Sequence, residues 1–174
     1  MSKSILLILI LFLQTSLYAQ VVVKPSEQLI YSFETVSQKK ALIAYDTANR
    51  KMVYRFGTKK STELEISHDT SSYTCDYVDT NEYKNTFSYN FYYRCCGAAN
   101  LGENDNYFEF INNGFFYSVY YEYTAVGNST QIGIRVTNLT TNKESEINGI
   151  LKTQKGGLDD YRLRKFVLNT YGKR

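Results

Sequence analysis

Residues 107–123, YFEFINNGFFYSVYYEY, decide the fold of this chain. Aromatic and branched apolar residues stand on both sides of Asn113-Gly114, and residues of these types favour pleated strands. Asn-Gly accepts the positive φ angles of a type I′ turn, which joins two antiparallel strands through two residues. After the turn, the residues at alternate positions are Phe115, Tyr117, Val119, Tyr121 and Tyr123, and alternation places them on one face. The segment therefore predicts a β-hairpin.

The rest of the chain extends this prediction. It holds 17 tyrosines and 10 phenylalanines among 174 residues but only one proline. Further short runs of strand-forming residues are Leu29–Phe33, Ala41–Tyr45, Met52–Phe56, Leu64–Ile66, Phe87–Tyr93 and Ile132–Val136. Turn-forming residues separate the first four runs, as in a meander. We predict an all-β fold, mainly an antiparallel sandwich or barrel of about eight to ten strands.

A short helix is predicted near the C-terminus, over Leu158–Leu168. Asp159 and Asp160 stand near its beginning and basic residues follow, which is the charge order that a helix dipole favours.

Residues 1–19 are expected to be a secretory signal peptide. Lys3 precedes the apolar run Ile5–Leu13, which is too short to span a bilayer, and Ala19 offers a small residue before the cut. An uncleaved anchor is the alternative interpretation. Residues 20–174 would then form a single β-rich domain in the periplasm or outside the cell, with no stable membrane anchor after cleavage.

Charge and composition argue against several classes of function. The net charge is +3, and acidic and basic residues are interspersed, so we expect no nucleic-acid partner. No catalytic or cofactor-binding motif is present, and His68 is the only histidine. We therefore expect no cofactor, no metal and no catalytic residues, and a protein that is not an enzyme.

The three cysteines are candidates for a disulfide, because a secreted protein meets an oxidising environment. Cys95 and Cys96 are adjacent and cannot easily pair with each other. We expect Cys75 to pair with one of them, which leaves the other as a buried thiol or as a link between two chains.

Two groups of residues are candidates for binding. Glu103, Asp105 and Asn106 lie in a polar stretch ahead of the hairpin, which reads as a loop that could contact a ligand or partner. Tyr92 and Tyr120 fall on the opposite face from their alternating neighbours, which suggests a second, exposed aromatic surface.

Two resemblances bear on function. The run Met52–Gly57 followed by Glu63-Leu64-Glu65 resembles the YRFG…ELE segment of small secreted bacterial proteins of unknown function. The order Tyr31–Phe33, Leu42–Tyr45 and Met52–Phe56 also resembles inhibitors of C-type lysozyme. The second resemblance implies a compact β barrel that inserts a loop into the lysozyme cleft.

The sequence therefore predicts a non-enzymatic secreted binding protein. Its most concrete partner would be a protein, such as a lysozyme-like or antagonistic enzyme. A glycan or cell-wall binding module that uses exposed tyrosines is one alternative, and an envelope structural protein is another. An unusual hydrolase that uses Glu103 and Asp105 is a further hypothesis.

Overall fold

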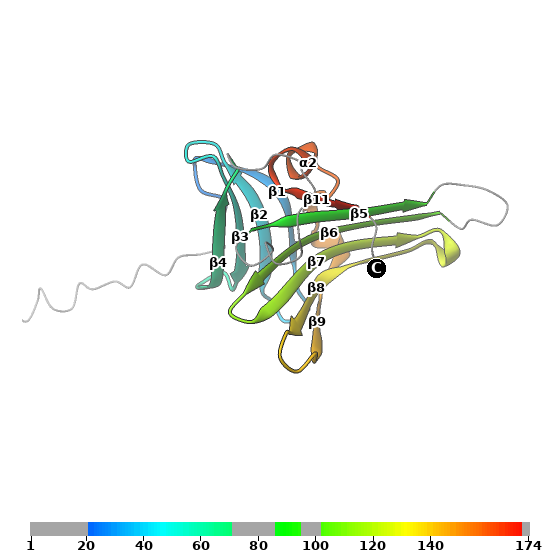
Figure 1. Ribbon diagram of the computed structural model, residues 1–174. Helices are drawn as coiled ribbons and strands as arrows, with labels where there is room; N and C mark the ends of the chain where they lie inside the picture. The colour runs from blue at the N-terminus through cyan, green and yellow to red at the C-terminus, as the bar shows by residue number, and fades with distance from the viewer. Residues whose placement is uncertain (1–20, 71–85, 95–101, 172–174) are drawn as a thin grey trace, which may run out of the picture.

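The computed structural model describes residues 21–70, 86–94 and 102–171, which form two packed β-sheets (Figure 1). The first is a five-stranded sheet with the strand order β10-β1-β2-β3-β4. Its antiparallel strands are β1 (Glu27–Glu34), β2 (Lys40–Asp46), β3 (Lys51–Gly57), β4 (Thr62–Asp69) and β10 (Lys155–Gly156). The predicted meander of four N-terminal strands is confirmed.

The second sheet has six strands in the order β11-β5-β6-β7-β8-β9. These strands are β5 (Ser88–Arg94), β6 (Glu103–Asn112), β7 (Phe115–Thr124), β8 (Ser129–Asn138), β9 (Glu144–Asn148) and β11 (Leu168–Tyr171). All pairings are antiparallel except that of β11 with β5. The predicted fold class is confirmed as two sheets with a sandwich-like core, and they do not close into a barrel.

The core lies between the two sheets and is largely aromatic. Its fully buried large members include Tyr31, Phe33, Ile43, Met52 and Tyr54 from the first sheet and Phe87, Tyr89, Phe108, Val119 and Ile134 from the second. They occupy alternate positions along their strands, as a half-buried sheet requires. Burial of this aromatic area is the main force that holds the sheets together.

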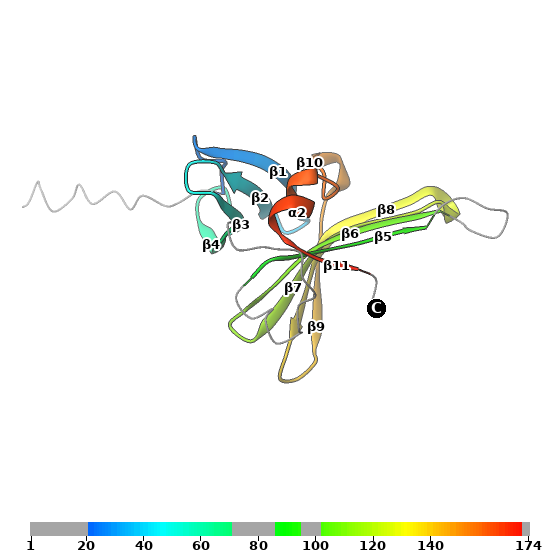
Figure 2. The same cartoon turned by 45° about the horizontal axis from the view of Figure 1, so that its top comes forward.

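The strands of the two sheets cross at a steep angle, and the six-stranded sheet is the longer one (Figure 1). Figure 2 shows β5, β6 and β8 continuing past the five-stranded sheet. We call this end, residues 92–94, 103–105, 122–124 and 129–131, the distal arm. The alternating aromatics of β5 follow this geometry, because Tyr89 is fully buried, Phe91 is partly buried and Tyr93 is 64% exposed.

The predicted hairpin is present. Asn113 and Gly114 have φ angles of 48° and 79° and join Asn112 to its partner Phe115 across the ladder. The other connections include two 3-10 turns, η2 (Val126–Asn128) and η3 (Leu151–Thr153). The second of these turns lies in the connection that returns the chain from β9 to the five-stranded sheet at β10.

The predicted C-terminal helix is present but shorter, as α2 (Tyr161–Phe166). The side chain of Asp160 caps it by accepting a hydrogen bond from the backbone N–H of Arg162. Leu158 precedes this cap, and Leu168 already belongs to β11, so neither is helical. Leu163 is the buried residue of α2 and joins the core between the sheets.

Some predictions fall on other parts of the chain. The expected signal peptide, residues 1–19, and the three cysteines, Cys75, Cys95 and Cys96, lie outside the described residues. Among the helices that the structure describes, none has the length and apolar character needed to cross a membrane.

Candidate functional site

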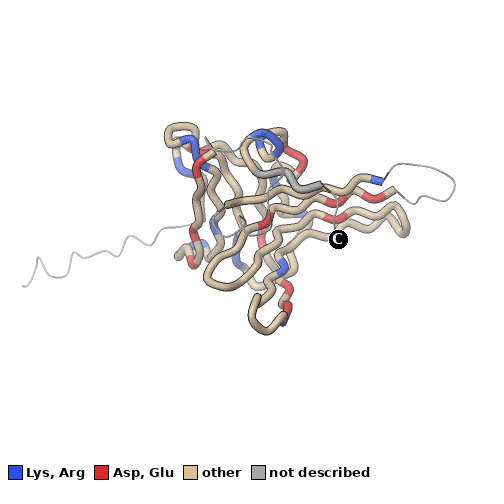
Figure 3. The backbone as a smooth tube through the Cα atoms, in the orientation of Figure 1, with Lys and Arg blue, Asp and Glu red and all other residues tan. Residues whose placement is uncertain are grey.

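The outer face of the six-stranded sheet is rich in charged side chains. Alternation along the paired strands places six carboxylates and two guanidinium groups on it. The carboxylates belong to Glu103, Asp105, Glu109, Glu122, Glu144 and Glu146, and the guanidinium groups belong to Arg94 and Arg135. This is an excess of four negative charges on a chain whose net charge is +3. Figure 3 shows the acidic positions in red along these strands. We call this surface the acidic face.

The acidic face is open in the described part of the chain. The five-stranded sheet packs on the opposite side, and α2 buries Leu163 in the core between the sheets, so neither covers it (Figure 1). Several charged side chains of the face are partly exposed, since Arg135, Glu122 and Glu146 are 21%, 22% and 42% exposed, whereas Tyr107 and Ser118 on the same face are buried.

Arg135 on β8 is the centre of the hydrogen-bond network of this face. Its two terminal nitrogens donate to the two carboxylate oxygens of Glu122 at 2.6 and 2.8 Å, and its Nε lies 3.3 Å from Oε1 of Glu146. The hydroxyl of Tyr107 donates to Glu122 and that of Tyr120 to Glu146, both at 2.9 Å. The Arg135 guanidinium also lies over the Tyr120 ring, 4.1 Å from its centre. These contacts hold the charged side chains at the centre of the face in fixed positions.

Tyr120 was predicted to be exposed, and this prediction is wrong, because the side chain is 1% exposed. It does point to the outer face, but Gly133 is its direct partner on β8 and has no side chain. A Cβ at Gly133 would lie 2.5 Å from the Tyr120 hydroxyl, so the ring occupies the space above the glycine. Burial and the hydrogen bond to Glu146 raise the pKa of Tyr120 above its ordinary value.

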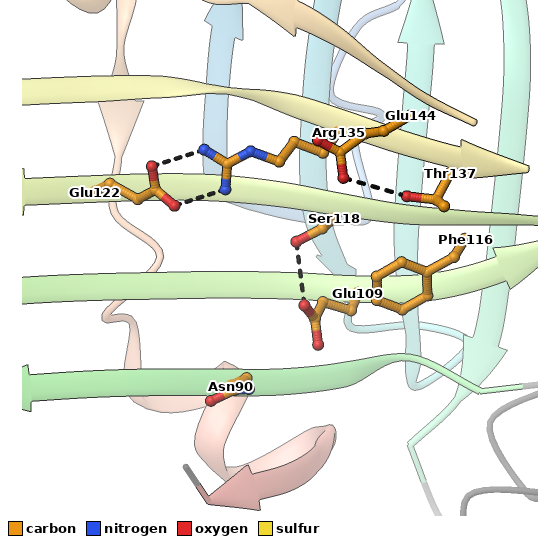
Figure 4. Close-up of a pocket in the computed structure, with 8 residues that line it drawn as sticks. All are labelled: Asn90, Glu109, Phe116, Ser118, Glu122, Arg135, Thr137 and Glu144. Atoms are coloured by element: carbon orange, nitrogen blue, oxygen red, sulfur yellow. Dashed lines mark hydrogen bonds and ion pairs between the residues drawn. The ribbon is translucent and has the colours of Figure 1, made fainter. Parts of the chain in front are cut away.

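A groove of about 690 Å³ crosses the acidic face (Figure 4). Its lining residues are Asn90, Glu109, Phe116, Ser118, Glu122, Arg135, Thr137 and Glu144. Glu109 accepts a hydrogen bond from Ser118 at 3.1 Å, and Glu144 lies 3.5 Å from the Thr137 hydroxyl. Phe116 supplies the aromatic surface at one end of the groove in the close-up. The groove thus combines ordered polar groups with one apolar contact.

The polar stretch that contains Glu103, Asp105 and Asn106 was predicted to be a loop, and the structure corrects this, because all three lie in β6. Hydrogen-bonded neighbours on both sides, β5 and β7, extend this strand through residues that are typical of loops. Glu103 and Asp105 belong to the acidic face. Asn106 points to the inner side, is 3% exposed, and accepts a hydrogen bond from the Tyr89 hydroxyl at 2.6 Å.

The structure brings part of the predicted site together. Tyr92 is 42% exposed and is the direct partner of Asp105, so the two share the distal end of the acidic face. The sequence-based prediction did not include Glu122, Glu146 or Arg135 among the site residues. A charged residue between the inward Ile134 and Val136 marks an outer position, but only the register shows that it meets Glu122.

The described residues outside this face offer few groups for chemistry. Within the ranges that the structure describes, no three His, Cys, Asp or Glu side chains are arranged to hold a metal ion. His68 lies on β4 of the other sheet with its ring edge-on to Phe87, 4.6 Å between ring centres. Burial lowers the pKa of His68, and nearby Asp69 acts in the opposite direction.

Comparison with models of protein families, with curated proteins and with solved structures finds no match for this chain. The geometry of the acidic face is therefore the basis on which a function can be inferred.

Proposed function

We propose that this chain is a secreted, non-enzymatic binding protein whose acidic face binds a positively charged partner protein. The observation that carries the proposal is the excess of four negative charges among the described residues on one sheet face, within a chain that is positively charged as a whole. Charge of one sign gathered on one surface creates a field that attracts a partner of opposite charge.

The size of the face suits a protein better than a small molecule. Ten-residue strands such as β6, β7 and β8 are about 33 Å long, and five neighbouring strands are about 19 Å wide. The face therefore covers roughly 600 Å², which is close to the ~800 Å² that each partner contributes to a typical protein–protein interface.

The hydrogen bonds already formed within the acidic face also favour a protein partner over a small molecule. Glu122 and Arg135 bind each other through two parallel hydrogen bonds, so neither has its full set of hydrogen bonds to offer a small ligand. Their positions are nevertheless fixed, which lowers the entropy cost of docking a rigid surface. The exposed ring of Tyr92 and the groove residue Phe116 add aromatic contact area of the kind that anchors interfaces.

The most concrete partner class is a lysozyme-like or other antagonistic enzyme with a basic surface. The expected secretion and the resemblance of the first strands to inhibitors of C-type lysozyme support this choice. The acidic face would cover the basic surface of such an enzyme and block access to its substrate.

The direct test measures binding of the mature protein, residues 20–174, to a C-type lysozyme by surface plasmon resonance. The test variant replaces Glu109→Gln and Glu144→Gln in the groove, which removes two negative charges and preserves the shapes of the side chains. We expect Kd to rise about tenfold, mostly through slower association.

The matched control carries Glu34→Gln and Glu63→Gln on the five-stranded sheet, where both side chains are also accessible. It makes the same change in net charge away from the acidic face and should bind almost as the wild type does. The proposal is wrong if no basic protein in a panel of lysozymes binds, or if the two double variants weaken binding equally.

A further inference from the structure

A second concave site lies between the sheets and is separate from the acidic face. It is a crevice of about 190 Å³ where the inner side of the six-stranded sheet passes the segment 154–159. Its lining residues are Asn104, Asn106, Tyr121, Gln154, Gly156, Gly157, Leu158 and Asp159. We infer that this crevice binds one neutral sugar residue, either free or at the end of a glycan, and this inference does not depend on the proposed protein-binding function.

The hydrogen-bonding groups of the crevice determine this ligand class. Three amide side chains, those of Asn104, Asn106 and Gln154, can each donate and accept hydrogen bonds, as a sugar hydroxyl also does. Asp159 adds a carboxylate that can accept from two neighbouring hydroxyls. No lysine or arginine is among the lining residues, and the Arg164 guanidinium that acts on the neighbouring Tyr89 hydroxyl is held over the Phe91 ring, 4.6 Å from its centre. A phosphate or another anionic ligand would therefore meet the Asp159 carboxylate without a cation in the lining.

The innermost groups are already held in position. Asn106 is 3% exposed, its Oδ1 accepts a hydrogen bond from the Tyr89 hydroxyl, and its Nδ2 donates to Oδ1 of Asn104 at 2.9 Å. This chain of hydrogen bonds runs from the core to the crevice and orients both amides. Tyr121 is the direct partner of Asn106 on β7 and offers a ring against which the C–H face of a sugar can pack.

The opposite wall depends on two glycines. Gly156 has a φ of 71°, and a Cβ there would overlap the backbone carbonyl of Ile30, so β10 lies very close to β1 at this point. A Cβ at Gly157 would lie 2.3 Å from Oδ1 of Asp159, so the Asp159 carboxylate occupies the space that a side chain would need. The backbone therefore shapes this wall. The Asp159 carboxylate can occupy its position because Gly157 has no side chain.

The volume limits the ligand to a small one. Pockets for drug-sized molecules measure about 300–1,000 Å³, so a crevice of 190 Å³ suits a single ring and not a long stretch of polysaccharide. A site of this size would bind the end of a glycan chain.

The test is saturation-transfer NMR, followed by titration, with glucose, galactose and N-acetylglucosamine as probes and glucose 6-phosphate as the anionic comparison. We expect at least one neutral sugar to bind with a Kd near 1 mM and the phosphate to bind at least tenfold more weakly. Asn104→Ala and Gly157→Ala should each weaken sugar binding at least tenfold, the second by moving Asp159.

Gln131→Ala on the distal arm, an exposed position away from the crevice, is the matched control and should leave Kd unchanged. Gln154→Ala removes an amide at a partly exposed position and keeps the test valid if Gly157→Ala does not fold. The inference is overturned if no neutral sugar binds, if the phosphate binds as well as the sugars, or if Asn104→Ala and Gln154→Ala both retain the wild-type Kd. The acidic-face variants Glu109→Gln and Glu144→Gln should not alter sugar binding, so the two proposals fail independently.

Discussion

Gly133 controls the position of Tyr120 and, through it, the centre of the acidic face. The ring lies where a side chain at residue 133 would be, and its hydroxyl reaches Glu146. A Gly133→Ala substitution would place a methyl group 2.5 Å from that hydroxyl and 2.7 Å from the backbone carbonyl of Ile147. Because one neighbour is backbone, small side-chain movements alone cannot relieve the clash.

We expect Gly133→Ala to lower the free energy of unfolding by about 1–3 kcal/mol, the range that overpacking of a well-packed site costs. Urea unfolding, monitored by circular dichroism, measures this free energy of unfolding. Gln131→Ala, two residues earlier on the same face, should change it by less than about 0.5 kcal/mol, as is usual for exposed positions. Equal unfolding free energies for the wild type and Gly133→Ala would show that the ring is not held over the glycine.

At the scale of elements, a buried ion pair ties β1 to β3 on the outer side of the five-stranded sheet. Arg55 donates to the two oxygens of Glu27 at 2.7 and 2.6 Å, and both side chains are 1% exposed. Arg55 also contacts Glu65 on β4 and the backbone carbonyl of Val22. The pair therefore joins the first described residues of the chain to three strands.

Burial alone would raise the pKa of Glu27, but the hydrogen bonds from Arg55 outweigh it, and the pKa lies below its ordinary value. A carboxyl whose pKa is lower in the folded state stabilises the fold at pH values above its unfolded pKa of about 4.5. That contribution is lost as the pH falls through the folded-state pKa.

We expect Glu27→Gln to lower the free energy of unfolding by about 3 kcal/mol at pH 7, because it leaves the buried Arg55 charge partly unbalanced. The difference from the wild type should shrink as the pH falls from 5 towards 2. Urea unfolding at several pH values measures both effects, with the exposed Glu63→Gln as the control. Parallel pH profiles for the wild type and Glu27→Gln would contradict this account.

The elements also show which features a sequence can predict. The β6–β7 hairpin and the N-terminal meander depend on neighbouring residues, such as Asn113-Gly114 between two apolar runs, and both were predicted correctly. The strand at Glu103–Asn106 was mistaken for a loop, because its conformation depends on β5 and β7 and not on its own polar residues. The burial of Tyr120 depends on Gly133, which lies on a different strand, and alternation alone does not indicate it.

For the whole molecule, the two-layer arrangement explains why charged side chains gather on the acidic face. The five-stranded sheet covers one side of the long strands with an aromatic core, so their charged residues must gather on the other side. Since the chain has a net charge of +3, positive charge predominates over the rest of the molecule. The resulting separation of charge can orient the molecule as it approaches a basic partner.

This separation predicts how association depends on salt. The association rate with a C-type lysozyme should fall about ten- to a hundredfold between ~20 mM and ~500 mM NaCl, because salt screens charges beyond a few ångströms. The dissociation rate should change much less, since close contacts control it. Stopped-flow or surface plasmon resonance at five salt concentrations separates the two rates. An acidic protein of similar size should bind at no salt concentration, and an association rate with lysozyme that is independent of salt would mean that the acidic face does not guide binding.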